Sequence, residues 1–369
     1  MRGIVSLTSS FVDARFQGVA EQFQKIADSG DPAQFTAYVG GKLVVDLACG
    51  MQPDELTVVY SVTKALTAMT MAKLVDLNLL DLNQTVAHYW PEFAASGKQN
   101  ITVRQLLSHQ AGLPETRAGL RPEQLMDGRA AADLLAAEMP LWHPGHGFGY
   151  HSLSIGPLAG ELCRRVTGNT IQEYYEAELR KPAGAHAFIG IQPEFESKVV
   201  DLLPQLPLPG SDEPIARMNP LEEHVSRDVP ATFISSLEGM RAGLASASGV
   251  ASARGLTALF QWATGYGQGD SGISAQTLEA FAQTQVFGPD WVSGANPRSH
   301  GVLFMKATTA IPFGSYRAFG HDGYSGGIVV ADPVGEIVYA YVPQRVPNPA
   351  GMDRRAQPII DALRKAALS

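Results

Sequence analysis

The spacing of apolar residues predicts a helix, a hairpin and a second helix in the first quarter of the chain. Between residues 11 and 27, apolar positions recur every three or four residues, as on an amphipathic helix. Two β-rich runs within 34–47 meet at Gly40 and Gly41, a pair typical of a β-hairpin turn. Helical spacing returns over 58–75, which is predicted to form a helix with a buried face.

Helical signals dominate the middle of the chain, and strand signals dominate its end. Apolar periodicity predicts helices at 103–108, 133–138, 153–166 and 249–263. A stretch with five prolines, 203–220, is predicted to be a long surface loop at the rim of a pocket. Strands are expected at 301–305, 316–319, 326–331 and 336–342, followed by a helix at 357–367.

This order of elements predicts an α/β (α+β) fold in which an antiparallel sheet is flanked by helices. The early hairpin is expected to join the late strands in one sheet. The sheet domain would then be discontinuous, comprising 1–84 and 266–369, and 85–265 would form an inserted, mainly helical domain. We expect the active site at the interface of the two.

Composition narrows the class of protein. The content of hydrophobic residues is 45% and that of charged residues 17%, which is typical of a soluble globular protein with a large core. A net charge of −8 disfavours nucleic acid and anionic membranes as partners. The N-terminal stretch lacks a signal-peptide pattern and no window is apolar enough to span a membrane, so we expect a cytoplasmic protein. In that compartment Cys49 and Cys163 are expected to be buried free thiols.

Ser61 and Lys64 stand at the start of the helix predicted over 58–75. Residues three apart on a helix share one side, so the Lys64 ammonium can approach the Ser61 hydroxyl. A serine becomes a useful nucleophile when a neighbour takes its proton, and a lysine does so only when it is neutral. Burial and the positive end of a helix both favour the neutral amine. The same helix end offers free N–H groups to an oxyanion.

The pair alone leaves a solvated lysine on an ordinary helix equally open, because Ser-x-x-Lys arises by chance about once in such a chain. Two further motifs follow, Tyr150-His-Ser152 and His321-Asp-Gly323. In this order the three motifs resemble those of the serine β-lactamase and penicillin-binding protein superfamily. They are most similar to the class C β-lactamase-like branch, including the family VIII carboxylesterases, whose middle motif begins with tyrosine. The stretches 101–114, 150–162 and 319–327 around the motifs also resemble that family.

The resemblance implies a β-lactamase/transpeptidase-like fold and a role for several residues. Ser61 would be the acylated nucleophile, Lys64 its general base, and Tyr150 a second acid/base that passes a proton to the leaving group. The N–H groups of Ser61 and Tyr324 would form the oxyanion hole. His321 would stand where the family often has a lysine and would assist Tyr150 or the substrate.

Two motif positions depart from the β-lactamases, and both bear on the substrate. Ser152 replaces an asparagine that helps to hold the acylamino side chain, and His321 replaces a lysine, so that its charge is conditional at neutral pH. Both departures weaken recognition of a β-lactam and leave ester hydrolysis unaffected. Gly323 and Ser152 are predicted to contribute to substrate binding through their motifs, and Trp142 could line an acyl pocket or simply pack in the core.

Three other patterns are weaker candidates for chemistry. His143 and His146 flank a Pro-Gly pair without a third ligand nearby, so they are interpreted as loop residues and not as a metal site. The Gly269-Asp-Ser-Gly272 stretch lies in a glycine-rich linker without the context of a trypsin-like nucleophile. Ser325 lies in a Gly-x-Ser-x-Gly motif, but a β-rich run follows it where a nucleophile elbow requires a helix.

We therefore predict a serine carboxylesterase that cleaves small, short-acyl esters without a cofactor or metal. A D-amino-acid peptidase or amidase and a weak β-lactamase share the same chemistry and stay open. A catalytically silent ligand-binding module is the alternative of another class, and the presence of Ser61, Lys64 and Tyr150 disfavours it. The natural ester, the stereochemical preference and the oligomeric state are left open.

Overall fold

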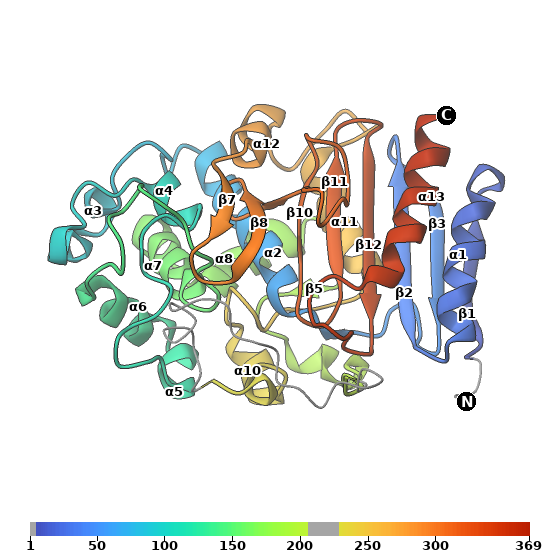
Figure 1. Ribbon diagram of the computed structural model, residues 1–369, viewed down its shortest axis with the longest axis horizontal. Coiled ribbons are helices and arrows are strands. Elements are labelled where there is room, and N and C mark those ends of the chain that lie inside the picture. Colours follow the sequence, from blue (N-terminus) through green and yellow to red (C-terminus); the bar gives the residue numbers. More distant parts are fainter. Residues whose placement is uncertain (1–4, 206–228) are drawn as a thin grey trace.

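A nine-stranded antiparallel sheet runs through the residues that the computed structural model describes, 5–205 and 229–369 (Figure 1). In spatial order its strands are β1 (Leu7–Val12), β3 (Lys42–Cys49), β2 (Ala33–Val39), β12 (Ile337–Pro343), β11 (Ile328–Asp332), β10 (Phe319–Asp322), β9 (Met305–Lys306), β8 (Gly294–His300) and β7 (Val286–Asp290). The pairing of β2 with β12 brings the two ends of the chain into one sheet, as predicted.

The predicted hairpin is confirmed by the pairing of β2 with β3, whose last partners are Val39 and Lys42. Gly40 and Gly41 both have positive φ, 54° and 74°, which suits a two-residue turn that follows the twist of the strands. A side chain at either position would be strained. The dipeptide therefore sets the register of the hairpin.

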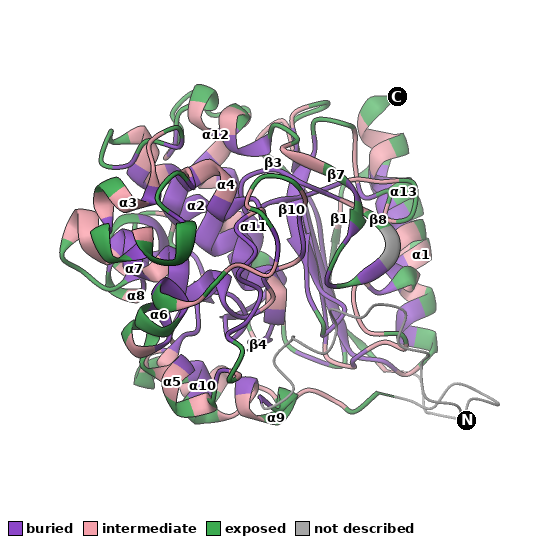
Figure 2. Cartoon of the chain, turned by 60° about the vertical axis from the view of Figure 1, so that its left-hand side comes forward, coloured by how far each residue is buried: buried purple, intermediate pink, exposed green. Residues whose placement is uncertain are grey.

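Both faces of the sheet are covered, and the central strand β12 is accordingly apolar and buried at every position. The odd-numbered residues of β12 face the core under α1 (Gln17–Asp28) and α13 (Gln357–Leu368): Ile337, Tyr339 and Tyr341. Its even-numbered residues join the other core, which includes side chains of α11 (Ala253–Thr264): Val338, Ala340 and Val342. Figure 1 shows α1 and α13 side by side over one face of the sheet, and Figure 2 shows that the strands between the helices are mostly buried.

The remaining helices lie mainly to one side of the sheet and in the middle of the sequence. They are α2 (Thr63–Asp76), α3 (Val86–Tyr89), α4 (Val103–Leu107), α5 (Pro122–Met126), α6 (Gly128–Ala137), α7 (Ile155–Thr167), α8 (Ile171–Tyr175), α9 (Ala231–Ile234), α10 (Leu237–Ala242) and α12 (Ala275–Ala282). Three short strands, β4 (Thr57–Val58), β6 (Val250–Ala251) and β5 (Ala187–Phe188), form a second sheet in the described residues. The helices predicted at 103–108, 133–138, 153–166 and 357–367 correspond to α4, α6, α7 and α13. The range 85–265 is mainly helical, but α11 within it packs on the large sheet, and the domain boundaries stay a prediction.

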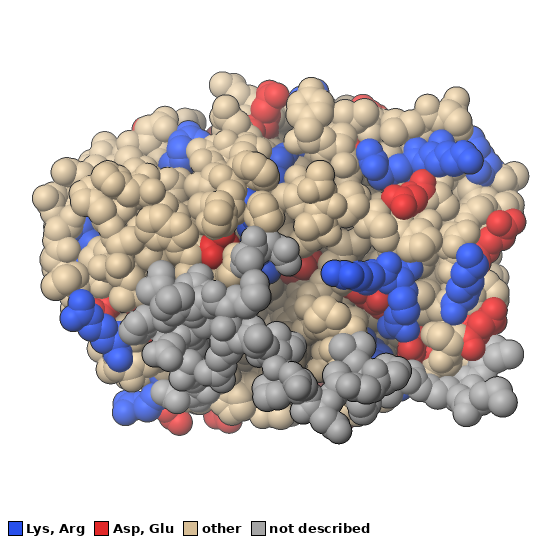
Figure 3. Space-filling model, in the orientation of Figure 1, with Lys and Arg blue, Asp and Glu red and all other residues tan. Residues whose placement is uncertain are grey.

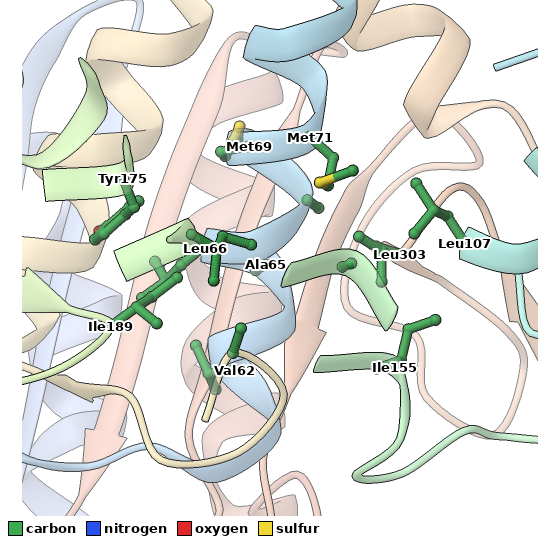
Figure 4. Packing of buried hydrophobic residues seen from close by; sticks show 14 of the residues in the cluster. Val62, Ala65, Leu66, Met69, Met71, Leu107, Ile155, Tyr175, Ile189 and Leu303 are labelled. Atoms are coloured by element: carbon green, nitrogen blue, oxygen red, sulfur yellow. The ribbon is translucent and has the colours of Figure 1, made fainter. Parts of the chain in front are cut away.

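Helix α2 is buried on all sides, not only on the one face that the periodicity indicated. It packs against α7, α8, α12 and β10. In Figure 4, Leu66 lies toward Tyr175 and Ile189 on one side of the helix, and Met71 lies toward Leu107 and Leu303 on the other. Burial on all sides is typical of a helix at the centre of a large protein. The start of α2 is thus held rigidly.

Several sequence-based predictions of elements are wrong in detail. Strand β1 was not predicted, because its alternation is weak and much of it is exposed at the sheet edge, and α1 begins only at Gln17. The hairpin of β7 and β8 was also missed, since glycine, proline and asparagine interrupt its pattern. Of the run 301–305 only Met305 lies in a strand, and Tyr316 lies in an exposed turn. Most of the predicted loop 203–220 falls outside the described residues.

Cys49 and Cys163 are free and buried, as predicted. No helix in the described part of the chain is long and apolar enough to cross a membrane, and the cytoplasmic compartment stays a prediction. On the face shown in Figure 3, basic side chains are interspersed with acidic ones.

Candidate active site

Ser61 lies in a short 3-10 turn (Tyr60–Val62) that leads directly into α2. Tyr60 has a positive φ of 47°, which is unusual for a residue with a side chain and marks a strained turn. The Val59 N–H donates to the Gly249 carbonyl at 2.9 Å, and the Thr63 hydroxyl donates to the Tyr60 carbonyl. These bonds fix Ser61 at the mouth of the helix, where main-chain N–H groups have no intrahelical acceptor.

Lys64 is fully buried, and its Nζ lies 3.1 Å from Ser61 Oγ. Nζ also donates to the Ser246 carbonyl at 2.8 Å, so the amine is held between the two groups. Burial lowers the pKa of Lys64 well below its usual value, Asp322 opposes this change, and Arg298 adds to it. The neutral amine that a proton acceptor requires is therefore accessible at neutral pH.

Tyr150 lies beside this pair, with Lys64 Nζ 4.7 Å from the centre of its ring. Burial raises the pKa of its hydroxyl, and a hydrogen bond with the Ser61 side chain lowers it. The middle motif thus meets the first across the interface between α2 and the segment before α7. Ser61, Lys64 and Tyr150, which the sequence predicts to act together, are neighbours in the structure.

Asp290 positions Tyr150, and the sequence analysis missed it. Its Oδ1 accepts the main-chain N–H groups of Tyr150 (3.1 Å), Val292 (2.9 Å) and Ser293 (2.9 Å). Although burial opposes ionisation, these hydrogen bonds keep the pKa of Asp290 below its usual value. Asp290 ends β7, so it could not be placed near Tyr150 while the β7–β8 hairpin was unrecognised.

The third motif ends β10 against the turn that carries Ser61. His321 is fully buried, its Nδ1 donates to the Asp322 carbonyl at 2.6 Å, and burial is the main reason that its pKa falls to about 3. It is therefore uncharged at neutral pH. A Cβ atom on Gly323 would lie 2.1 Å from the Val59 carbonyl oxygen, so only glycine lets β10 approach this turn so closely. Tyr324 is 45% exposed, and its ring lies 5.1 Å from that of Tyr60.

The remaining predicted site residues are Ser152 and Trp142, and both lie next to His151. Ser152 is half-buried after His151, whose Nε2 accepts the Leu113 N–H at 2.9 Å. Trp142 is buried against His151 and Trp291, with ring centres 5.9 and 5.7 Å apart, so its described contacts are those of a packing residue. A role for either in substrate binding stays a prediction.

The weaker candidates keep their structural interpretation. Ser325 is buried in the turn before β11, so a strand follows it directly where a nucleophile elbow requires a helix. His143 and His146 lie with ring centres 4.2 Å apart in a loop. Among the described residues, no group of three or more His, Cys, Asp or Glu side chains could hold a metal ion.

Three more residues around Tyr150 escaped the sequence analysis. His109 and His300 lie with ring centres 5.1 and 6.0 Å from the tyrosine, and the Arg298 Cζ atom lies 5.4 Å from it. His109 stands in the stretch 101–114 that resembles the family, which was the one available signal. Arg298 and His300 belong to β8 of the missed hairpin.

The sequence model of the beta-lactamase family matches residues 16–364, almost the whole chain. The chain belongs to this family. The solved structure of EstA from Arthrobacter nitroguajacolicus Rue61a is 37% identical in sequence and has a TM-score of 0.89. The alignment covers 97% of this chain and 98% of the EstA chain. The solved structure of a family VIII carboxylesterase is 28% identical and has a TM-score of 0.88, and the alignment covers 98% of this chain and 100% of the carboxylesterase chain. Esterase/beta-lactamase LipL of Mycobacterium tuberculosis is 29% identical over 351 residues, 86% of this chain and 78% of that protein.

These likenesses confirm the predicted superfamily and the β-lactamase-like fold with its mostly antiparallel sheet. They also confirm the prediction of an enzyme, since this member of the beta-lactamase family is a serine hydrolase with esterase-like relatives.

Proposed function

We propose that this serine hydrolase is a carboxylesterase that cleaves small, short-acyl esters through an acyl-enzyme on Ser61. The observation that carries the proposal is the buried Lys64 amine, 3.1 Å from the Ser61 hydroxyl. Tyr150 completes the group, with its ring beside Lys64 and its hydroxyl hydrogen-bonded to Ser61. Esterase-like relatives support the substrate class.

In the acylation step, Ser61 Oγ attacks the ester carbonyl carbon while its proton passes to Lys64 Nζ. The oxyanion that forms would accept the N–H groups of Ser61 and Tyr324. When the intermediate collapses, the bond to the alkoxide breaks, and Tyr150 transfers a proton to the alkoxide so that a neutral alcohol leaves. Lys64 then returns the first proton to Tyr150.

In the deacylation step, a water molecule replaces the alcohol and follows the same path in reverse. The Lys64–Tyr150 pair takes a proton from the water, the hydroxide oxygen bonds to the acyl carbon, and the bond to Ser61 Oγ breaks. Ser61 recovers its proton, and the carboxylic acid is released. The three side chains end in their starting state, so no cofactor is required.

The site chemistry favours esters over β-lactams and amides. His321 provides no positive charge at neutral pH where many relatives place a lysine, and Ser152 lacks the amide of an asparagine. An alkoxide leaves more easily than an amine and depends less on accurate protonation. The β-lactamase activity named for the relative LipL makes weak β-lactam hydrolysis the second candidate.

The test compares kcat/KM for 4-nitrophenyl butyrate, nitrocefin and a D-alanyl anilide. We expect the ester to be preferred at least about a hundredfold, which corresponds to roughly 2.7 kcal/mol in transition-state stabilisation. Ser61→Ala is the control for background hydrolysis. Equal kcat/KM values for the ester and nitrocefin would refute the esterase assignment in favour of a β-lactamase. A preference for the anilide would refute it in favour of an amidase.

A further inference from the structure

Arg298 lies beside the catalytic group without a charge partner of its own. Its Cζ atom is 5.4 Å from the centre of the Tyr150 ring, within the range of a cation–π interaction. Among the described residues, no carboxylate lies within 4 Å of the Arg298 guanidinium, and no group accepts a hydrogen bond from it. Its cross-strand partner on β7 is Gly288, so no side chain stands opposite Arg298 on that strand.

Other arginines of the described residues are paired with carboxylates. Arg254, for example, binds Asp46, and Arg317 lies 3.3 Å from Glu279. A half-buried arginine that leaves its charge unpaired loses solvation without gaining an ion pair. The aromatic ring of Tyr150 is the partner that the structure supplies for this charge.

The titratable and charged groups facing Tyr150 and Lys64 come from four parts of the chain. They are His109 after α4, Asp290 on β7, Arg298 and His300 on β8, and His321 and Asp322 on β10. Burial lowers the pKa of each of the three histidines, to about 3 for His300 and His321, so none is charged at neutral pH. Since a guanidinium does not lose its proton in this range, Arg298 is the one permanent cation of this set.

The two carboxylates oppose the effect of Arg298 on Tyr150, and each accepts main-chain N–H groups through one of its oxygens. Asp290 Oδ1 accepts three main-chain N–H groups, as described above. Asp322 Oδ2 accepts the Met352 N–H at 3.0 Å. Neither carboxylate neutralises Arg298 in a direct ion pair, so its field extends over the ring of Tyr150 toward Lys64.

This field acts in the same direction on both candidate bases. A nearby cation disfavours an ammonium and favours a phenolate, and Arg298 accordingly lowers the pKa of Lys64 and that of Tyr150. The effect on proton transfer from Ser61 is therefore the same whether the lysine or the tyrosine takes the proton.

We propose that Arg298 is a positioning residue whose fixed positive charge disfavours an extra proton on the Ser61–Lys64–Tyr150 group. The group can therefore accept the Ser61 proton at neutral pH. The proposal rests on the proposed function of these three residues. It explains how a site whose third motif carries a neutral histidine retains a positive charge, supplied from a different strand.

The test measures the pH dependence of two reactions, ester hydrolysis and fluorophosphonate labelling of Ser61, in the Arg298→Gln variant. We expect the ascending limb of kcat/KM for 4-nitrophenyl butyrate to move up by at least about one pH unit, which is a tenfold loss on that limb. The high-pH plateau is expected to stay near that of the wild type. The rate of Ser61 labelling by a fluorophosphonate is expected to shift in the same way. Arg298→Lys, which retains a positive charge, should recover most of both shifts.

Arg317→Gln is the matched control, because it removes an arginine charge that pairs with Glu279 and does not lie over the Tyr150 ring. Its profiles should match the wild type. An unchanged profile in Arg298→Gln, or an equal loss at every pH, would overturn the proposal. A loss confined to the carboxylate-bearing 4-nitrophenyl hemisuccinate would also overturn it and make Arg298 a substrate anchor.

The two proposals fail in different ways. A wild-type protein that hydrolyses no nitrophenyl ester refutes the carboxylesterase function, while the pH profile of fluorophosphonate labelling still decides the role of Arg298. Should Arg298→Gln not fold, as judged by its thermal transition, Arg298→Met and Arg298→Lys provide the same comparison of a neutral and a charged side chain.

Discussion

Replacing Gly323 with alanine should disable the active site while leaving the fold in place. A Cβ atom at this position would lie 2.1 Å from the Val59 carbonyl oxygen and 3.2 Å from Val62 Cγ2. Ordinary contacts of a Cβ atom begin near 3.4 Å, so the end of β10 or the turn carrying Ser61 must retreat by about 1 Å. The turn resists this movement, because the Val59 N–H is bonded to the Gly249 carbonyl.

A displacement of about 1 Å between reacting groups typically lowers rates about a hundredfold. We therefore expect kcat/KM for 4-nitrophenyl butyrate and the rate of fluorophosphonate labelling to fall together by about that factor. Overpacking of this kind should lower the free energy of unfolding by about 1–3 kcal/mol, measured by denaturant titration. The strand itself should persist, because β10 is paired with both β9 and β11.

Gly18→Ala is the matched control, since a Cβ atom on this residue of α1 would have no neighbour within 4 Å. It should leave both rates unchanged and stabilise the protein by up to about 1 kcal/mol, as expected for an alanine in a helix. A Gly323→Ala protein with wild-type labelling and turnover would refute the argument that this glycine is required for the approach of β10 to Ser61.

Three further predictions concern the nucleophile, the proton path and the thiols. Ser61→Ala should abolish the covalent adduct seen by intact mass after fluorophosphonate treatment, whereas Ser325→Ala, in the buried turn before β11, should retain it; the opposite result would move the nucleophile to Ser325. Lys64→Ala and Tyr150→Phe should each lower kcat at least about a hundredfold, and the double variant should lose little more than the worse single one, while additive losses would mean separate proton paths. Burial raises the pKa of Cys49 to about 11 and that of Cys163 to about 12, so at pH 8 the folded protein should resist alkylation by iodoacetamide and react only when unfolded; rapid labelling of the native protein would contradict this burial.

Much of the fold could be predicted because it depends on local patterns. The Gly40-Gly41 turn, the helix after Ser61 and the C-terminal helix each follow from neighbouring residues and were found. Strand β1 and the β7–β8 hairpin were not, because a strand with weak alternation or internal proline is held by its partners in the sheet and not by its own residues. Long-range pairing decides such elements.

The same division applies to the active site. The amino-acid sequence by itself determined the order of the three motifs, the pairing of Ser61 with Lys64 over one helical turn, and thus the superfamily. The tertiary structure decided that Lys64 is fully buried, that His321 is uncharged, and that Arg298 and Asp290 reach Tyr150 from a hairpin far along the chain. The spacing of residues on a helix is a local property, whereas burial and the field of a charge depend on every segment that packs around the site.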